Sequence, residues 1–276
     1  MSAVCGHLAA VLPDFARWCC RSGLGVGVAG QYAVTGNLAA RQALHSAFST
    51  AGRRWPYWVF DRLGLVAEET VVEFGAGTGV LWRDNAERLP AGVRLLLTDR
   101  SAAMCQALRQ IGLPGVLVAG ADAERPPLAS AVADLVVANH MLYHLRRPQA
   151  ALAEMARMLR PGGRAVVATN GAGHLRQLRE LLTELDIPVG PPWHSCFPLE
   201  TAPAHLGAVF DRVDVHEFDN ALHITDPGPV LGYVASLTML TDQQAQQIHD
   251  AVADRIATAG VFHVDTASGL LIASTT

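Results

Sequence analysis

The stretch VVEFGAGTGVLW, residues 71–82, decides the fold because it joins a short apolar run to a glycine-rich turn. A short β-branched run bounded by glycine is typical of a buried strand, and a helical pattern follows the turn. Gly75, Gly77 and Gly79 alternate with other residues in this turn. Glycine costs backbone entropy, so three of them indicate that the backbone approaches something closely here.

Strand-like and helix-like segments alternate after this turn, with further strands predicted at residues 93–99, 115–122, 132–140 and 164–170. This alternation predicts an α/β fold with a doubly wound, mostly parallel sheet that carries helices on both faces. Two helical patterns precede the sheet, at residues 37–48 and 55–65. After it, the sequence predicts a strand at 210–218 and a closing antiparallel pair, residues 261–265 with 269–275.

Composition narrows the class of protein. The chain has 276 residues, a net charge of −4 and no lysine, and its runs of basic residues do not exceed a pair of arginines. A nucleic-acid partner is therefore not expected. The 5 cysteines form no CxxC pair or metal-ligand spacing, which is typical of reduced thiols. The sequence has neither a membrane-length apolar run nor a secretory leader pattern, so we expect a cytoplasmic protein.

The glycine turn does not fit two common phosphate-binding motifs. A dinucleotide loop would have glycine where Val80 stands, and a P-loop would need a lysine. The next predicted strand ends at Asp99, whose carboxylate can accept both hydroxyls of a ribose or can cap the following helix. Asp122, after the third strand, can accept from an exocyclic amine or can be an ordinary loop carboxylate.

Four segments in order resemble the class I S-adenosylmethionine-dependent methyltransferases, in their small-molecule, type-11-like branch. They are VVEFGAGTG, LTDRSAAM, GADAERPPLASAVADLVVANHMLYHL and MLRPGGRAVVATN. The resemblance is strong over residues 32–170. It implies a Rossmann-like sheet of seven strands whose last strand is antiparallel. It also implies S-adenosyl-L-methionine as cofactor, S-adenosyl-L-homocysteine as product, and no metal.

The resemblance also implies where each part of the cofactor binds. The methionine part would border Glu73, Gly75, Ala76, Gly77 and Gly79, the ribose would bind Asp99, the adenine would lie near Arg100, Met104, Asp122 and Ala123, and the sulfonium would lie near Asn139 and His140. Within a helical segment or lid expected at residues 1–64, residues 31–50 resemble the lid-like helices of this branch, and Tyr32, His45 and Ser49 are candidate cofactor or substrate contacts there. We expect residues 65–276 to form the catalytic domain. An insertion near 171–208 contains Trp193 and His194 in a proline-rich loop that either caps the substrate or is an ordinary solvent-exposed loop.

Methyl transfer requires a positioned acceptor and in some cases a base, for which histidine is suited near neutral pH. His140 and His144 are four residues apart, and Tyr32 is a further candidate. His140 is expected to face the site, whereas His144 is either a base or a packed histidine. A metal site of the H-E-x-x-H type is not predicted, because Met141 stands where the glutamate would be. Helical spacing favours packing over an aromatic cage for Trp55, Trp58 and Trp82.

The sequence therefore predicts a methyltransferase that acts on a small-molecule acceptor of natural-product biosynthesis, as a monomer or homodimer. Two alternatives stay open. One is a methyltransferase that acts on RNA or protein. The other is a protein that binds S-adenosylmethionine without methylating, as a regulator or pericyclic catalyst, because a fold does not dictate a function.

Overall fold

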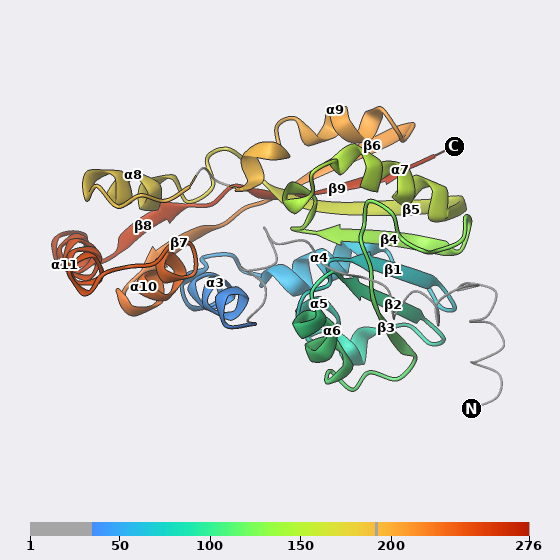
Figure 1. The fold of residues 1–276 in the computed structure, drawn as a ribbon, viewed down its shortest axis with the longest axis horizontal. Helices are drawn as coiled ribbons and strands as arrows, with labels where there is room; N and C mark the ends of the chain where they lie inside the picture. Colours follow the sequence, from blue (N-terminus) through green and yellow to red (C-terminus); the bar gives the residue numbers. More distant parts are fainter. Residues whose placement is uncertain (1–34, 191–192, 276) are drawn as a thin grey trace.

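The computed structural model describes residues 35–190 and 193–275, and its main feature is a seven-stranded sheet in the order β3-β2-β1-β4-β5-β9-β6 (Figure 1). All neighbours pair in parallel except β9, which is antiparallel to both β5 and β6. The predicted Rossmann-like sheet with an antiparallel last strand is confirmed. The strands are β1 (Thr70–Phe74), β2 (Arg94–Asp99), β3 (Val116–Gly120), β4 (Ala133–Asn139), β5 (Leu159–Asn170), β6 (Arg212–Phe218) and β9 (Ser268–Ser274).

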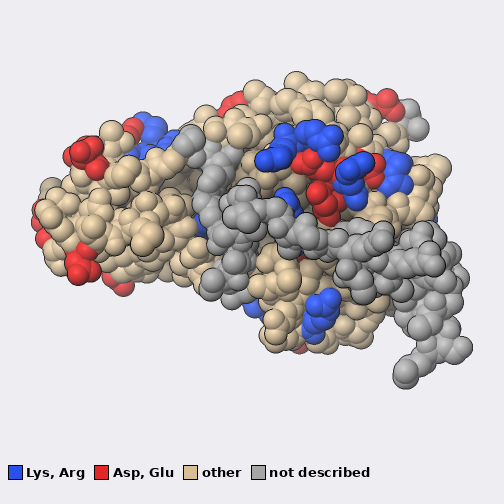
Figure 2. Space-filling view, viewed as in Figure 1, with Lys and Arg blue, Asp and Glu red and all other residues tan. Residues whose placement is uncertain are grey.

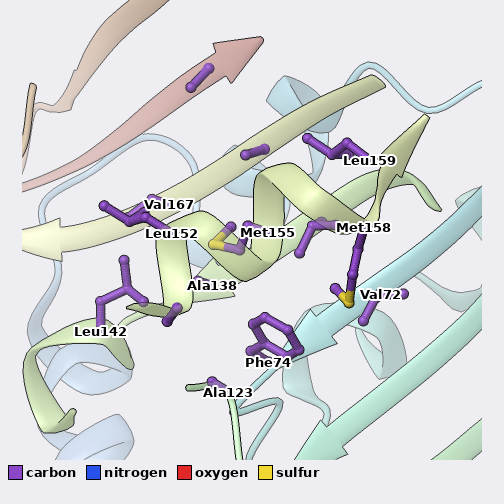
Figure 3. Close-up of a cluster of buried hydrophobic side chains, with 14 of the residues drawn as sticks. Val72, Phe74, Ala123, Ala138, Leu142, Leu152, Met155, Met158, Leu159 and Val167 are labelled. Atoms are coloured by element: carbon purple, nitrogen blue, oxygen red, sulfur yellow. The ribbon is translucent and has the colours of Figure 1, made fainter. Parts of the chain in front are cut away.

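Helices cover both faces of this sheet because alternate strand residues point to opposite sides. Val72 and Phe74 share one apolar cluster with Leu152 and Met155 of α7 (Pro148–Met158), as Figure 3 shows. Val71, which directly precedes Val72, belongs to a second cluster on the other face. That cluster includes residues of α4 (Trp55–Leu63), α5 (Val80–Arg83) and α6 (Ala102–Arg109), whereas α9 (Ala202–Gly207) contributes to the first.

Local signals set several of the boundaries. Pro56 lies in the first turn of α4, and Gly64 ends that helix in a left-handed conformation with φ 60°. The helix expected after the glycine turn is short, since α5 has 4 residues and a separate 3-10 turn follows at Ala86–Arg88. Strand β5 begins before the expected residue 164, because Leu159 already pairs with Ala133 and a bulge absorbs the register shift.

A second lobe lies beside the carboxyl ends of the main strands (Figure 1). Its apolar core draws on all of its elements, including Leu44, Leu178 and Leu222. The elements of this lobe are α3 (Thr35–Phe48), α8 (Arg176–Glu184), β7 (Ala221–Ile224), α10 (Gly228–Ala235), α11 (Asp242–Ala259) and β8 (Phe262–Asp265). The second lobe is thus assembled from three separate stretches of the chain. The division of the chain into residues 1–64 and 65–276 stays a prediction.

The closing pair of strands predicted from the sequence was wrong. Strand β8 pairs with β7 in a two-stranded sheet, and β9 instead enters the main sheet between β5 and β6. The reason is burial, since Leu270 and Leu271 on β9 are both fully buried on opposite faces of the main sheet. The four-residue strand β7 was not predicted. No helix in the described ranges is long and apolar enough to cross a membrane.

Candidate functional site

A cavity of about 990 Å³ lies between the carboxyl ends of the main strands and the second lobe. Its walls on the sheet side are the turn after β1 and the residues that follow β2, β3 and β4. Its opposite wall is formed by residues of α3, α8 and α10. In open α/β sheets, ligands bind outside the carboxyl ends of the strands where the strand order reverses, and here β1 lies at that reversal.

The three glycines of the turn all have left-handed backbone, with φ values of 62° for Gly75, 59° for Gly77 and 72° for Gly79. Each also lacks room for a side chain. A Cβ on Gly75 would lie 2.8 Å from Cβ of Met141, and one on Gly77 would lie 3.2 Å from Leu38 of α3. Gly75 and Gly77 line the cavity. Gly79 is the N-cap of α5, and a Cβ there would meet Leu108 at 2.9 Å, so this glycine serves packing between helices.

Asp99 is fixed against the glycine turn by backbone hydrogen bonds. One carboxylate oxygen accepts the N–H of Gly77 at 3.0 Å, and the other accepts the N–H of Ser101 at 2.8 Å. Burial raises the pKa of Asp99, and these bonds oppose that shift. The N-cap of α6 is Ser101, whose side chain accepts from Met104. Because each carboxylate oxygen has a further lone pair, Asp99 can still accept hydroxyl groups from a ligand in the cavity.

Glu73 is buried beneath the same turn. Its carboxylate accepts a hydrogen bond from the indole N–H of Trp82, and its backbone carbonyl accepts from the hydroxyl of Thr98 at 2.9 Å. Burial raises the pKa of Glu73 to about 8, with Trp82 acting in the opposite direction and Asp99 adding to the increase. Glu73 is therefore mostly protonated at neutral pH, although it lines the cavity beside Asp99.

The residues predicted to surround an adenine also line this cavity. Ala123 is buried, and Asp122 accepts the N–H of Glu124 at 2.9 Å, which holds the loop after β3 in place. The residues predicted to lie near the adenine all line the cavity, namely Arg100, Met104, Asp122 and Ala123. Ala76, predicted beside the methionine part, lines it as well.

The end of β4 presents Asn139 and His140 to the cavity. His140 has left-handed backbone with φ 55°, and its N–H donates to the carbonyl of Ala168 at 3.1 Å. Trp55 reaches this point from α4, because its indole N–H donates to Asn139 at 3.4 Å and its ring centroid lies 4.8 Å from that of His140. Helical spacing in the sequence favoured a packing role for Trp55, but the structure places this residue in the wall of the cavity. Trp58, which stacks on Trp55, is buried as expected.

The glycine turn falls within a stretch that matches a known family, and so do β2 and β4, the two strands that flank β1 in the sheet. Residues 72–167 match the family model Methyltransf_11, described as a methyltransferase domain. This stretch is therefore similar to a methyltransferase domain over about a third of the chain. All the predicted cofactor residues, from Glu73 to His140, lie within the methyltransferase domain.

Curated relatives differ in their acceptors. The chain is 32% identical over 132 residues to the demethylmenaquinone methyltransferase of Renibacterium salmoninarum, which covers 48% of this chain and 54% of that protein. It is 33% identical over 127 residues to the malonyl-[acyl-carrier protein] O-methyltransferase of Hahella chejuensis, and this match covers 46% of this chain and 41% of that protein. The chain spans about half the length of such relatives or less. The methyltransferase domain is therefore shared, whereas the acceptor is not fixed by it.

A solved structure shows the same fold over most of the chain. It is a putative methyltransferase from an antibiotic biosynthesis pathway of Anabaena variabilis, with a TM-score of 0.61 and 19% sequence identity. The match covers 80% of this chain and 96% of that one. At this identity the likeness extends to the fold alone.

The wall opposite the methyltransferase domain contains two stacked histidines. His45 of α3 and His174, after β5, have parallel rings with centroids 5.5 Å apart. Burial lowers the pKa of His45 to about 4, so its imidazole is neutral at neutral pH. His174 accepts the N–H of Ala267 at Nδ1, 3.3 Å away. His45 was predicted as a substrate contact and lines the cavity, whereas His174 carries no sequence signal because its position depends on the second lobe.

The remaining predicted residues are distributed as follows. Ser49 lines the cavity and donates to Asn220 at 2.8 Å. His144 lines it as well, and both burial and the positive charge of Arg41 lower the pKa of His144, to about 4. Tyr32 and the side chains of Trp193 and His194 lie outside the described part of the structure. Within the described part, no three His, Cys, Asp or Glu side chains gather as a metal-binding group.

Proposed function

We propose that this protein transfers the methyl group of S-adenosylmethionine to a small-molecule acceptor. The observation that carries the proposal is the shared cavity, which has Asp99 and the glycine turn on one wall and the neutral imidazole of His45 on the other. We propose that the acceptor belongs to natural-product biosynthesis and that the reaction takes place in the cytoplasm, with the protein as a monomer or homodimer.

The residues present fit this cofactor. Left-handed Gly75 and Gly77 leave no Cβ at the cavity wall, so a ligand can approach the backbone closely. Asp99 offers two fixed oxygens for the two ribose hydroxyls. Asp122 lies on the loop after β3, next to β2, where it can accept from an exocyclic amine. S-adenosylmethionine supplies a methyl group that is already activated on a sulfonium.

The protein's own contribution is to position the acceptor and to exclude water. His140 and Asn139 lie at the end of β4, and we propose that they hold the acceptor's reacting group, with His140 able to receive its proton. Trp55 covers them from α4. The second lobe closes the opposite side with aliphatic residues of α8, including Leu178 and Leu182. An acceptor with an apolar body fits such a wall.

The described surface offers less support for an RNA substrate. On the face in Figure 2, arginines lie beside acidic side chains rather than in a continuous basic stripe. The ion pairs of Arg53 with Asp61 and of Arg164 with Glu69 are of this kind. Recognition of RNA depends on basic surfaces that neutralise phosphates, so mixed charges favour a small acceptor.

The ribose assignment is tested by replacing Asp99. Because a hydrogen bond to a charged group contributes about 1.5–3 kcal/mol, Asp99→Asn should weaken S-adenosylmethionine binding by about 10- to 100-fold in calorimetry. Asp134→Asn is a matched control, since Asp134 also accepts a backbone N–H, from Thr70 at 2.7 Å, but lies at the start of β4, at the end of that strand away from the cavity. Unchanged affinity in Asp99→Asn would contradict the assignment.

The acceptor class is tested with S-adenosylmethionine labelled on the methyl group. The protein is incubated with extract that has been separated into small molecules, RNA and protein, and the label in each fraction is counted. Label in the small-molecule fraction supports the proposal, and label in RNA or protein supports the first alternative. Intact cofactor binding without transfer to any fraction supports a protein that does not methylate.

A further inference from the structure

The cavity extends past the strand ends that the proposed cofactor would occupy. In the order β3-β2-β1-β4-β5-β9, the residues proposed for the cofactor follow β3, β2 and β1, and the proposed reacting centre follows β4. Asn170, at the end of β5, and its partner Ser268, at the start of β9, line the cavity as well. The part of the cavity over β5 and β9 is therefore left for the acceptor.

His174, which follows β5, is a rigid wall of this part of the cavity. Its side chain is buried, its Nδ1 accepts the N–H of Ala267 at 3.3 Å, and its backbone carbonyl accepts from Arg179. A ring nitrogen that accepts a backbone N–H carries no proton, so the imidazole of His174 is neutral and has its proton on Nε2. The backbone thus fixes both the orientation and the tautomer of this ring.

His45 of α3 lies against the ring of His174. The two ring centroids are 5.5 Å apart and the planes are inclined by 18°. Within residues 35–190 and 193–275, no group hydrogen-bonds to either imidazole nitrogen of His45, and the residue lines the cavity. Because burial lowers the pKa of His45 to about 4, the ring is neutral, with one nitrogen that donates and one that accepts. His45 can therefore bind a hydroxyl or a carbonyl group of a ligand.

The surfaces around the two histidines are apolar. Leu175, Leu178 and Leu182 line the cavity from α8 and its N-cap. On the side of the main sheet, Phe218 of β6 pairs with Ser268, and its ring meets the ring of Trp55 edge-on with centroids 5.2 Å apart. Aromatic rings pack well against other rings at such angles. This part of the cavity therefore fits a ligand whose body is an uncharged ring system.

We propose that His45 determines specificity by hydrogen-bonding to an uncharged oxygen, a hydroxyl or a carbonyl, on an acceptor with an aromatic body. This inference rests on the proposed function, because it places the acceptor beside S-adenosylmethionine. Asn139 and His140 remain the proposed partners of the reacting group, so the oxygen at His45 is a second polar group of the acceptor. An acceptor without this oxygen would leave the imidazole of His45 unpaired, which lowers its affinity.

The test measures the binding of two defined ligands by calorimetry, on the full chain saturated with S-adenosylhomocysteine. 2,6-Dihydroxynaphthalene has one hydroxyl for the reacting-group site and a second for His45, whereas 6-methyl-2-naphthol has a methyl group in place of one hydroxyl. The wild type should bind the diol about 5- to 50-fold more tightly. His45→Phe keeps a ring against His174 but removes both nitrogens, so it should reduce this preference to about 2-fold or less.

His223→Phe is the matched control for this substitution. His223 lies on β7 of the same lobe, and its side chain is exposed. The control should keep the preference of the wild type for the diol, and a loss there would overturn the inference. Both variants should bind S-adenosylhomocysteine as the wild type does, because neither histidine belongs to the proposed cofactor contacts.

A preference of about 2-fold or less in the wild type, or no binding of either ligand, would overturn the inference. So would a wild-type preference in His45→Phe, or equal losses of both ligands there, which would show a structural role. Tighter binding of 6-hydroxy-2-naphthoate than of the diol would also overturn it and would indicate an anionic acceptor. If His45→Phe fails to fold, His45→Leu is measured with the same expectation. Failure of the wild type to bind S-adenosylhomocysteine would instead refute the proposed function.

Discussion

Glycine at position 75 is favoured for two reasons, its left-handed backbone and its close contact with Met141, and replacement with alanine measures their combined effect. Alanine in a left-handed conformation lowers the free energy of unfolding by about 1–2 kcal/mol. Because alanine also restricts the unfolded chain, about 0.4–1 kcal/mol of this loss is offset. At Gly75 the new Cβ would also lie 2.8 Å from Cβ of Met141. Two Cβ atoms cannot separate by a side-chain rotation, so the backbone must move, and such overpacking costs about 1–3 kcal/mol more.

Gly162→Ala is the matched control for this strain. Gly162 has φ 77°, and no atom lies within 4 Å of the position of its Cβ. Its replacement should therefore cost about 1 kcal/mol or less, the backbone term alone. Gly75→Ala should cost about 2–4 kcal/mol, which corresponds to a decrease in Tm of about 2–4 °C for each kcal/mol.

Urea unfolding and calorimetric titration with S-adenosylmethionine measure the two consequences. Gly75→Ala should lower both the free energy of unfolding and the affinity for the cofactor, because the turn that lines the cavity is displaced. Gly162→Ala should leave the affinity unchanged. Equal destabilisation by the two substitutions, with cofactor binding intact in both, would refute the reasoning from close packing at Gly75.

Two further predictions concern protonation and the aromatic cover of the site. Between pH 6.5 and 8 the native state retains the proton of Glu73, whose pKa is about 8, while the unfolded chain has released it. Stability should therefore fall by up to about 1.4 kcal/mol per pH unit as the pH rises, and Glu73→Gln should remove this slope in urea unfolding. Below pH 6.5 the opposite slope is expected, because His45 and His144 have pKa values of about 4 and the unfolded chain binds protons that the native state excludes. Trp55→Phe keeps an aromatic ring but removes the hydrogen bond to Asn139, so methyl transfer should slow by about 2- to 10-fold, with Trp58→Phe as the control that leaves it unchanged.

The sheet edge of the site could be predicted from the sequence because parallel strands end together. Gly75, Asp99, Asp122 and His140 each follow a different strand, and a doubly wound sheet brings the ends of its strands to one edge. The spacing of residues along the chain is enough to place such groups near one another. These residues line one cavity, although their individual roles stay predictions.

The opposite wall could not be predicted in the same way. It depends on how α3, α8 and α10 pack, and these helices come from distant parts of the sequence. Arg41 and Ser236 are 195 residues apart, and no local pattern relates them. The pairing of β8 was missed for a related reason, because nearness in sequence favoured β9 as its partner, whereas burial placed β9 inside the main sheet.

The two histidines after β4 were both candidate bases, and the structure distinguishes them. A general base is most effective when its pKa lies near the working pH, and the pKa of His144 is lowered to about 4 by burial and by Arg41. His144 therefore attracts a proton only weakly at neutral pH. His140 instead occupies a left-handed conformation, which is costly for a residue with a side chain and persists only where its surroundings enforce it. The bond to Ala168 and the contact with Trp55 supply that constraint, and we infer that it serves to aim His140 at the acceptor.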